Sequence, residues 1–156
     1  MIDRLGLEGN RAAIPFPRPL LETDSLDFSF SGLKTAVLNH VKSLGGKASP
    51  DQIRQIAASF QEAVVDTLVS KVLRAAVKES TKEVVVVGGV ACNSRLREKF
   101  FQEGNDAGIA VHFPPPALCT DNAAMVAVAG FHLLKEGLRS DLLLNAYSRF
   151  GGGKIQ

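Results

Sequence analysis

Two polar residues of this chain follow apolar segments at positions where a ligand could bind. The first is Asn93, which comes four residues after a glycine pair, Gly88-Gly89, that closes the run VVVV. The second is Asp121, in the segment CTDNAAM. A side-chain amide can contact a nucleotide, and carboxylate oxygens bind hard divalent metals. Because ligands of open α/β sheets lie beyond the carboxyl ends of the strands, these residues are candidates for a ligand site.

Each candidate also has a purely structural interpretation. Gly88 and Gly89 leave room for the backbone to approach a nucleotide, or only the next helix. Asn93 is a typical N-cap residue, and a cap at a helix N-terminus can also face a phosphate or a ribose. Asp121 is equally suited to an N-cap, and one carboxylate does not make a metal site. The local pattern leaves both interpretations open.

Other polar groups have patterns that favour structural roles. Asp3 in MIDRLG opens a short helical pattern and can favour a helix N-terminus electrostatically. Lys34 lacks the glycine spacing of a phosphate-binding loop, so we interpret it as a solvated helix residue. The histidines form no pair at helical spacing and the cysteines have no histidine nearby in the sequence, so a nucleophilic triad has no support. These residues are His40, His112, His132, Cys92 and Cys119.

Composition excludes some classes of protein. The chain has 156 residues and is 46% hydrophobic, enough for one sizeable core in one or two small lobes. A net charge of +2 gives no electrostatic footprint for nucleic acid. The apolar run at 123–131 is about half as long as a membrane span, and no signal peptide is visible. Two cysteines favour a reducing compartment. We expect a soluble cytoplasmic protein with no membrane partner.

The first half of the chain predicts an irregular segment followed by a strand and two helices. Residues 1–25 read as irregular, with three prolines within 14–19. The segment LDFSFSG at 26–32 alternates as a short strand should, with both phenylalanines on one face. A helix follows at 33–44, closed by a glycine pair. Ser49, Pro50 and Gln52 then predict the capped start of a long helix that reaches Ala76.

The second half predicts a β-α-β unit and a final helix. The strand at 83–87 is fully apolar at its core, which is typical of a strand buried on both faces. A helix at 94–102 and a strand at 109–113 complete the unit. The last helix, capped by Thr120 or Asp121 and ending at Gly137, is apolar nearly all round and should be buried. We therefore expect an α/β fold with three or more strands and four helices.

Three segments together resemble a known family. LDFSFSGLKTAV, VVVVGGVACNSRLRE and FPPPALCTDNAAMVAVAG, in this order, closely resemble the C-terminal half of the TsaD family, the tRNA threonylcarbamoyladenosine transferases. The resemblance implies a truncated RNase-H-like lobe of the actin, Hsp70 and sugar-kinase (ASKHA) superfold. In its terms, residues 1–25 are the junction with a missing first lobe, residues 26–145 form the C-terminal lobe, and residues 146–156 form a flexible tail.

The resemblance also implies roles for residues at matching positions. Asp121 matches an aspartate that ligates a divalent metal, usually iron or zinc. Asn93 and Asp3 match residues that contact threonylcarbamoyl-AMP or an adenine nucleotide. The pair Gly88-Gly89 fits the adenosine-binding turn of the superfold. No catalytic residue is assigned.

The chain also departs from the family. Family members are about twice as long, and their HxxxH histidine pair and PGGP turn are absent here. The implied metal site is therefore incomplete, since one carboxylate binds such ions poorly without the other ligands.

The implied activity is transfer of the threonylcarbamoyl group from threonylcarbamoyl-AMP to N6 of the adenosine beside the tRNA anticodon, with this chain inactive alone. The implied partners are tRNA and accessory threonylcarbamoylation proteins, and loss of the first lobe favours self-association.

One alternative is a non-catalytic lobe that binds a nucleotide or a partner. A sugar or acetate kinase lobe would need a catalytic aspartate that we do not find, and a metalloprotease would need HExxH.

Overall fold

The computed structural model describes residues 1–144, which fall into two compact units. The first is Met1–Thr120, and the second begins at Asp121. The expected flexible tail at 146–156 lies outside the described residues. Within the described part of the chain, no helix is long and apolar enough to cross a membrane.

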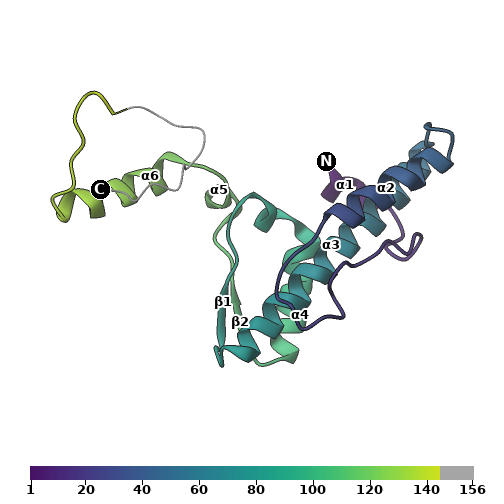
Figure 1. Cartoon of the computed structure of the whole chain (residues 1–156), viewed down its shortest axis with the longest axis horizontal. Coiled ribbons are helices and arrows are strands. Elements are labelled where there is room, and N and C mark those ends of the chain that lie inside the picture. The colour runs from purple at the N-terminus through teal and green to yellow at the C-terminus, as the bar shows by residue number, and fades with distance from the viewer. Residues whose placement is uncertain (145–156) are drawn as a thin grey trace. The chain divides into compact units, whose positions relative to one another are not determined.

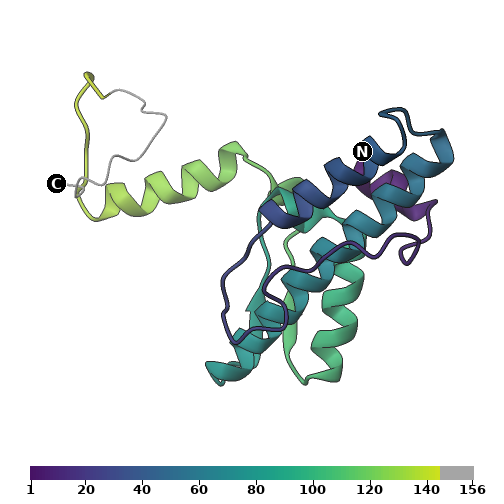
Figure 2. The same cartoon turned by 45° about the vertical axis from the view of Figure 1, so that its right-hand side comes forward.

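The first unit is organised around α3 (Pro50–Lys78), a helix of 29 residues (Figure 1). Its predicted start is confirmed: Gln52 N donates to Ser49 Oγ, and Ser49 N donates to Gln52 Oε1. The helices α1 (Ile2–Leu7), α2 (Ser31–Ser43) and α4 (Ser94–Asp106) pack along α3 (Figure 2).

Because it is contacted on several sides, α3 buries polar as well as apolar side chains. Apolar residues recur at helical spacing from Ile53 to Ala76, and this stripe is half-buried for most of its length, with Ile53 exposed. The buried polar residues of α3 are Ser59, Gln61, Thr67 and Lys71. The stripe alone therefore does not define the covered surface of this helix.

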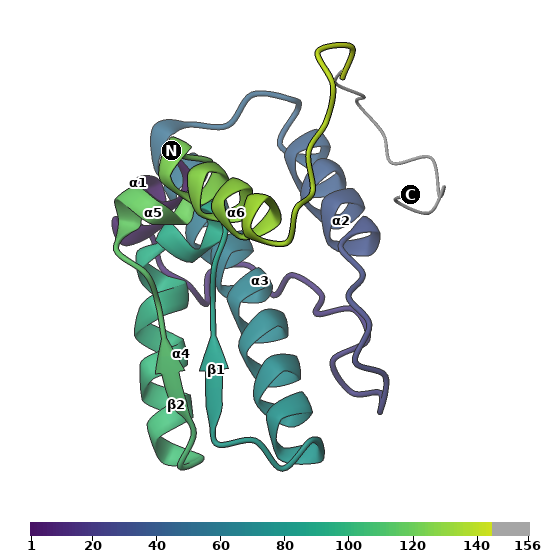
Figure 3. The ribbon, with the colours of Figure 1, turned by 90° about the vertical axis from the view of Figure 1, so that its left-hand side faces the viewer.

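A parallel pair of strands lies against α3 and α4 (Figure 3). The strands β1 (Glu83–Val85) and β2 (Ala110–His112) are joined through α4, which confirms the β-α-β unit. In the register of the pair, Val84 lies opposite Val111, and both pack onto a core that includes Phe100.

The sheet differs from the prediction in two respects. It has two strands among the described residues, where three or more were expected. Burial on both faces is also wrong, because Val85 and Val87 are each 67% exposed. The helices α3 and α4 cover one face, and no other element of the first unit's described residues forms a layer on the other.

The strand predicted at 26–32 is wrong as well. Residues 25–30 form neither helix nor strand, and α2 already begins at Ser31. The phenylalanines do share a face, since the rings of Phe28 and Phe30 stack with centroids 6.2 Å apart. A strand needs a hydrogen-bonded neighbour, and this segment pairs with no strand among the described residues.

The second unit contains α6 (Ala123–Lys135). Its cap is Asn122, whose Oδ1 accepts from Met125 N at 3.0 Å, so the prediction of Thr120 or Asp121 as the cap is wrong. The expected burial is also wrong, because no residue of α6 is buried. A single helix within its unit has no second layer to cover its apolar surface.

An irregular N-terminal strap, residues 8–25, lies along α3. Its contacts advance in the same direction as the helix: Ile14 N donates to Ser59 Oγ at 3.1 Å, and the buried Lys71 ammonium donates to the Ser25 carbonyl at 2.6 Å. The backbone at Gly9 runs so close to α3 that a Cβ there would collide with the Arg54 carbonyl.

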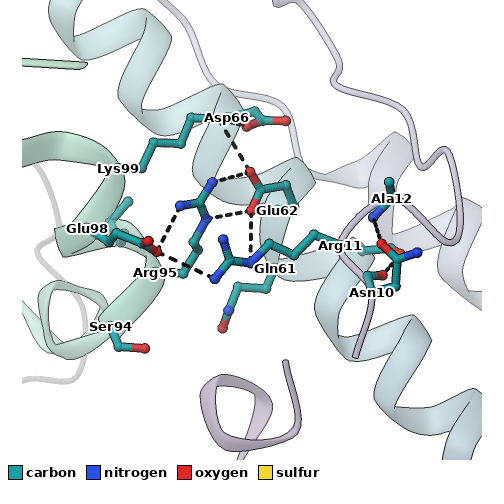
Figure 4. A network of polar contacts seen from close by, with 12 residues as sticks. Asn10, Arg11, Ala12, Gln61, Glu62, Asp66, Ser94, Arg95, Glu98 and Lys99 are labelled. Carbon is teal, nitrogen blue, oxygen red and sulfur yellow. Dashed lines mark hydrogen bonds and ion pairs between the residues drawn. The ribbon is translucent and has the colours of Figure 1, made fainter. Parts of the chain in front are cut away.

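A network of ion pairs joins the strap, α3 and α4 (Figure 4). Arg95 donates two hydrogen bonds to the carboxylate of Glu62, at 2.6 and 2.7 Å. Lys99 bonds to Asp66, which also accepts from Arg18 Nε at 2.7 Å. Such bidentate, partly buried pairs are more stabilising than exposed ones.

The network shifts the pKa values of its members. The hydrogen bond from Arg95 lowers the pKa of Glu62 below 4.5, against the opposing effect of burial. Burial alone would lower the pKa of Lys99, but the hydrogen bond and charge of Asp66 raise it above its ordinary value. The charged forms are therefore favoured in the folded state.

We predict that Glu62→Gln destabilises the protein by about 2 kcal/mol at neutral pH, because Arg95 loses a charged partner. Since the folded pKa of Glu62 is lowered, its contribution is present above pH 4.5 and is lost as the pH falls through the folded pKa. Denaturant unfolding at neutral and acidic pH should show the difference between variant and wild type shrinking in acid. The more exposed Glu98 provides the control, Glu98→Gln, and an equal loss at both pH values would contradict the assignment.

Candidate functional site

Two loops leave the carboxyl ends of the parallel strands and lie together. The loop after β1 contains the short helix η1 (Gly89–Cys92), and the loop after β2 contains α5 (Pro116–Cys119). These two helices pack against each other, and Cys92 Sγ donates to the Pro116 carbonyl at 3.5 Å. Gly88 opens the first loop with a φ of 90°, a left-handed conformation that favours glycine.

Arg97 of α4 bonds to the backbone of both loops. Its Nε donates to the Ala91 carbonyl at 2.6 Å, and its Nη2 donates to the Pro114 carbonyl at 2.9 Å. The same Nη2 lies 3.4 Å from Cys119 Sγ, and the guanidinium lies 4.7 Å above the Phe113 ring. One cation therefore sets the spacing between the two candidate ligand-bearing loops.

Asn93 is the N-cap of α4, as its structural interpretation predicted. Its Oδ1 accepts from Leu96 N at 2.9 Å. Its Nδ2 donates to Oε1 of the buried Gln61 at 2.8 Å. Sequence patterns did not identify Gln61, since a polar residue within a long amphipathic helix is most simply read as solvated.

Asp3 lies at the same helix N-terminus. Its carboxylate accepts from Ser94 N at 3.2 and 3.3 Å and from Ser94 Oγ at 2.7 Å. Asp3 opens α1, but the helix N-terminus that it stabilises through hydrogen bonds is that of α4. This contact spans 91 residues, so local sequence could not reveal it.

Three of the candidate ligand contacts, Asp3, Gly89 and Asn93, line one pocket of about 570 Å³. Gln61 and Cys92 line the pocket with them. Gly88 does not line it. A second, mostly apolar pocket of about 1090 Å³ shares residues such as Phe60 and Val64 with the first, so the two form one groove over α3. The arrangement presents hydrogen-bonding groups beside apolar surface, as small-molecule sites do.

Asp121 is an exposed residue that opens the second unit. No group of three or more histidine, cysteine, aspartate or glutamate side chains within residues 1–144 could hold a metal ion. The described donor set therefore does not fit a complete metal centre, which needs several ligands.

The remaining candidates have structural environments. Lys34 is exposed on α2, as predicted, although it lines the larger pocket. His40 is half-buried and lies edge-on to Phe16. Burial and the neighbouring Cys119 thiol raise the pKa of Cys92, which disfavours the nucleophilic thiolate form.

Comparisons with known proteins give a consistent result. The model of the family described as "TsaD: tRNA N6-adenosine threonylcarbamoyltransferase" matches residues 1–128. A protein of that name from Syntrophus aciditrophicus is 51% identical over 96% of this chain and 44% of its own length. One from Geobacter metallireducens is 53% identical over 93% of this chain and 42% of its own length. The chain thus spans less than half the length of these curated relatives.

We predict that Arg97→Met loosens the contact between the two loops. Losing charged hydrogen bonds to two carbonyls should make local opening about ten times more frequent. In a Cys92→Ser background, the buried thiol of Cys119 should then react about tenfold faster with a thiol reagent. Arg4→Met, at an exposed position of α1, is the control. An unchanged labelling rate in Arg97→Met would contradict the role of this residue.

Proposed function

The chain belongs to the TsaD family, and we propose that it forms the C-terminal part of a tRNA N6-adenosine threonylcarbamoyltransferase. The observation that carries the proposal is the pocket lined by Asp3, Gly89 and Asn93, at the carboxyl end of β1 and within the residues that match the family. Three residues singled out by their resemblance to the family thus line a single pocket.

The proposed reaction is an acyl transfer. The N6 amine of an adenosine beside the tRNA anticodon attacks the carbonyl carbon of threonylcarbamoyl-AMP. A C–N bond forms, the bond from that carbon to the phosphate oxygen breaks, AMP leaves, and N6 loses one proton. In this scheme the residues of the chain bind and orient the adenylate, so that the two reacting groups meet in a productive geometry.

The pocket chemistry favours particular contacts with the adenylate. The carboxylate of Asp3 already occupies the N-terminus of α4, which disfavours a phosphate at that point because the two negative charges repel. Hydroxyl groups such as those of a ribose can donate to this carboxylate. Gly89 has no side chain, so the space beside η1 is open to a ligand. A Cβ built at this position would have Thr120 Cγ2 as its nearest neighbour, 3.9 Å away.

We propose that Asp121 supplies one oxygen ligand to a divalent metal, iron or zinc, whose other ligands lie outside this chain. The support is its place in the segment CTDNAAM, its exposure and its carboxylate chemistry. The described residues of this chain do not complete such a site, so we expect the chain alone to have no transferase activity.

The fold of the first unit also supports a proposal about its superfold. We propose that the first unit is part of an RNase-H-like lobe of the ASKHA superfold, on the basis of its parallel β-α-β unit with a ligand pocket at the strand ends. In a full-length relative, the segment matching 26–32 should then pair as a strand and cover the sheet edge. A structure that left this segment unpaired would contradict the assignment.

The proposed partners are tRNA and accessory threonylcarbamoylation proteins, and the proposed location is the cytoplasm, where tRNA is modified. Cell fractionation tests the location.

A second candidate function is a non-catalytic lobe that binds a nucleotide or a partner. It is favoured by the combination of a pocket with an incomplete set of metal ligands, and it describes what we expect of the chain by itself.

We predict that the change equivalent to Asp121→Ala in a full-length relative abolishes threonylcarbamoyl transfer and lowers the bound iron or zinc. The measurements are transfer to tRNA and metal content of the purified protein. The chain described here, assayed in parallel, should show no transfer. The matched control is the change equivalent to Asp141→Ala, at another exposed aspartate of the second unit.

Activity that survives the Asp121 change with unaltered metal content would contradict its role as a ligand. Activity of the present chain alone would contradict the need for the rest of the family's length.

We predict that the chain self-associates, because it exposes apolar surface that a folded protein normally covers. On α6 the exposed side chains include Val126, Val128 and Phe131, and at the end of β1 and just after it they include Val85 and Val87. Light scattering over a range of protein concentrations should show a rising mass. Val85→Lys should reduce the association, and a mass that stays at 16.6 kDa at high concentration would contradict it.

A further inference from the structure

The orientation of the Asn93 amide is set by the end of a helix. The backbone N–H of Leu96 can only donate, so the group 2.9 Å away from it must be the carbonyl oxygen of the Asn93 side chain. The Nδ2 group of Asn93 then lies on the other side and donates to Gln61 at 2.8 Å. It follows that Gln61 presents its Oε1 to Asn93.

Gln61 is itself held in place. It is 4% exposed, and it projects from α3, the best-packed helix of the unit. On its other side it lies against α1, where a Cβ added to Gly6 would come within 2.9 Å of Gln61 Nε2. The side chain has little freedom to rotate away from Asn93, because displacing it would require movement of α1.

One N–H group of the Asn93 side chain remains to bind a ligand in the pocket. A primary amide carries two N–H groups, and one of them is used by Gln61. The second has no acceptor among the hydrogen bonds of residues 1–144, while Asn93 is half-buried and lines the 570 Å³ pocket. The carbonyl oxygen of the side chain is engaged at the helix end. Asn93 therefore meets a ligand as a donor.

We propose that Gln61 is a positioning residue, which holds Asn93 so that its free N–H binds a hydrogen-bond acceptor on the ligand. The ligand part of this inference rests on the proposed function. With Asp3 offering an acceptor in the same pocket, the matching ligand group both accepts and donates, as a hydroxyl does.

The first experiment follows the side-chain amide signals of Asn93 in ¹⁵N-labelled protein by NMR. Gln61→Leu removes the acceptor and should shift the Asn93 signals, whereas Gln61→Glu keeps an acceptor oxygen and should shift them less. Gly6→Ala should also shift them, because the added Cβ displaces the Gln61 amide. The control is Thr67→Val. Thr67 is another buried polar residue of α3, and its side chain bonds only within that helix, so this change should leave the Asn93 signals unchanged.

Unshifted Asn93 signals in both Gln61→Leu and Gly6→Ala would overturn the positioning role. Gly6→Ala keeps the test decisive if Gln61→Leu does not fold.

The second experiment measures the affinity of the same variants for AMP by calorimetry. Gln61→Leu should weaken binding about tenfold, the effect of one lost hydrogen bond, and Gln61→Glu should weaken it less. Asn93→Asp keeps the helix cap but cannot donate, and it should weaken binding at least as much. Thr67→Val should bind normally even if its unfolding temperature falls, which separates positioning from stability.

The outcomes distinguish this inference from the proposed function. If the wild-type chain bound no AMP while Asn93 still responded to Gln61→Leu, the ligand role would be overturned and the positioning of Asn93 would stand. If AMP bound equally to wild type, Gln61→Leu and Asn93→Asp, the nucleotide role of the pocket would survive and the donor role of Asn93 would be wrong.

Discussion

The first unit depends on the packing of one long helix. The strap, α1, α2 and α4 each contact α3, and both hydrophobic clusters include its residues. A helix contacted on so many sides must accommodate polar partners as well as apolar ones, because backbone carbonyls of the irregular strap need donors. This explains why Lys71 is buried beside a carbonyl. The same helix supplies Glu62 to the ion-pair network and Gln61 to the pocket.

The N-terminus of α4 is the second point on which the site depends. Its first turn has backbone N–H groups that lack partners within the helix. Asp3 binds one of them and Asn93 binds another. Both candidate ligand contacts are therefore also structural caps, so the two interpretations that the sequence left open are compatible. Arg97, one turn further along, ties the loops that follow β1 and β2 to the same helix.

Features with a local cause were predictable from the sequence. The Ser49 capping box and the cap at Asn93 each depend on residues close together in the chain, and the β-α-β unit follows from the order of three consecutive elements. The failures were of a different kind. The strand at 26–32 and the burial of β1 and α6 require neighbours that the described residues do not provide, and apolar composition cannot show whether such a neighbour exists. In the site, Gln61 and the Asp3–Ser94 contact were missed because their partners lie 32 and 91 residues away.

The strap has a consequence for the order in which the chain folds. Its contacts with α3 join residues that are 45 to 53 positions apart, and from Asn10–Gln55 to Ser25–Lys71 they advance along both segments. Helical turns of α3 can form from neighbouring residues, but each strap contact must first close a loop of that length. The segment synthesised earlier therefore has no surface to bind until the later one has formed. During translation the strap remains available to chaperones and proteases until α3 has emerged. Its contacts with α3 then form first near Gly9 and afterwards towards Ser25.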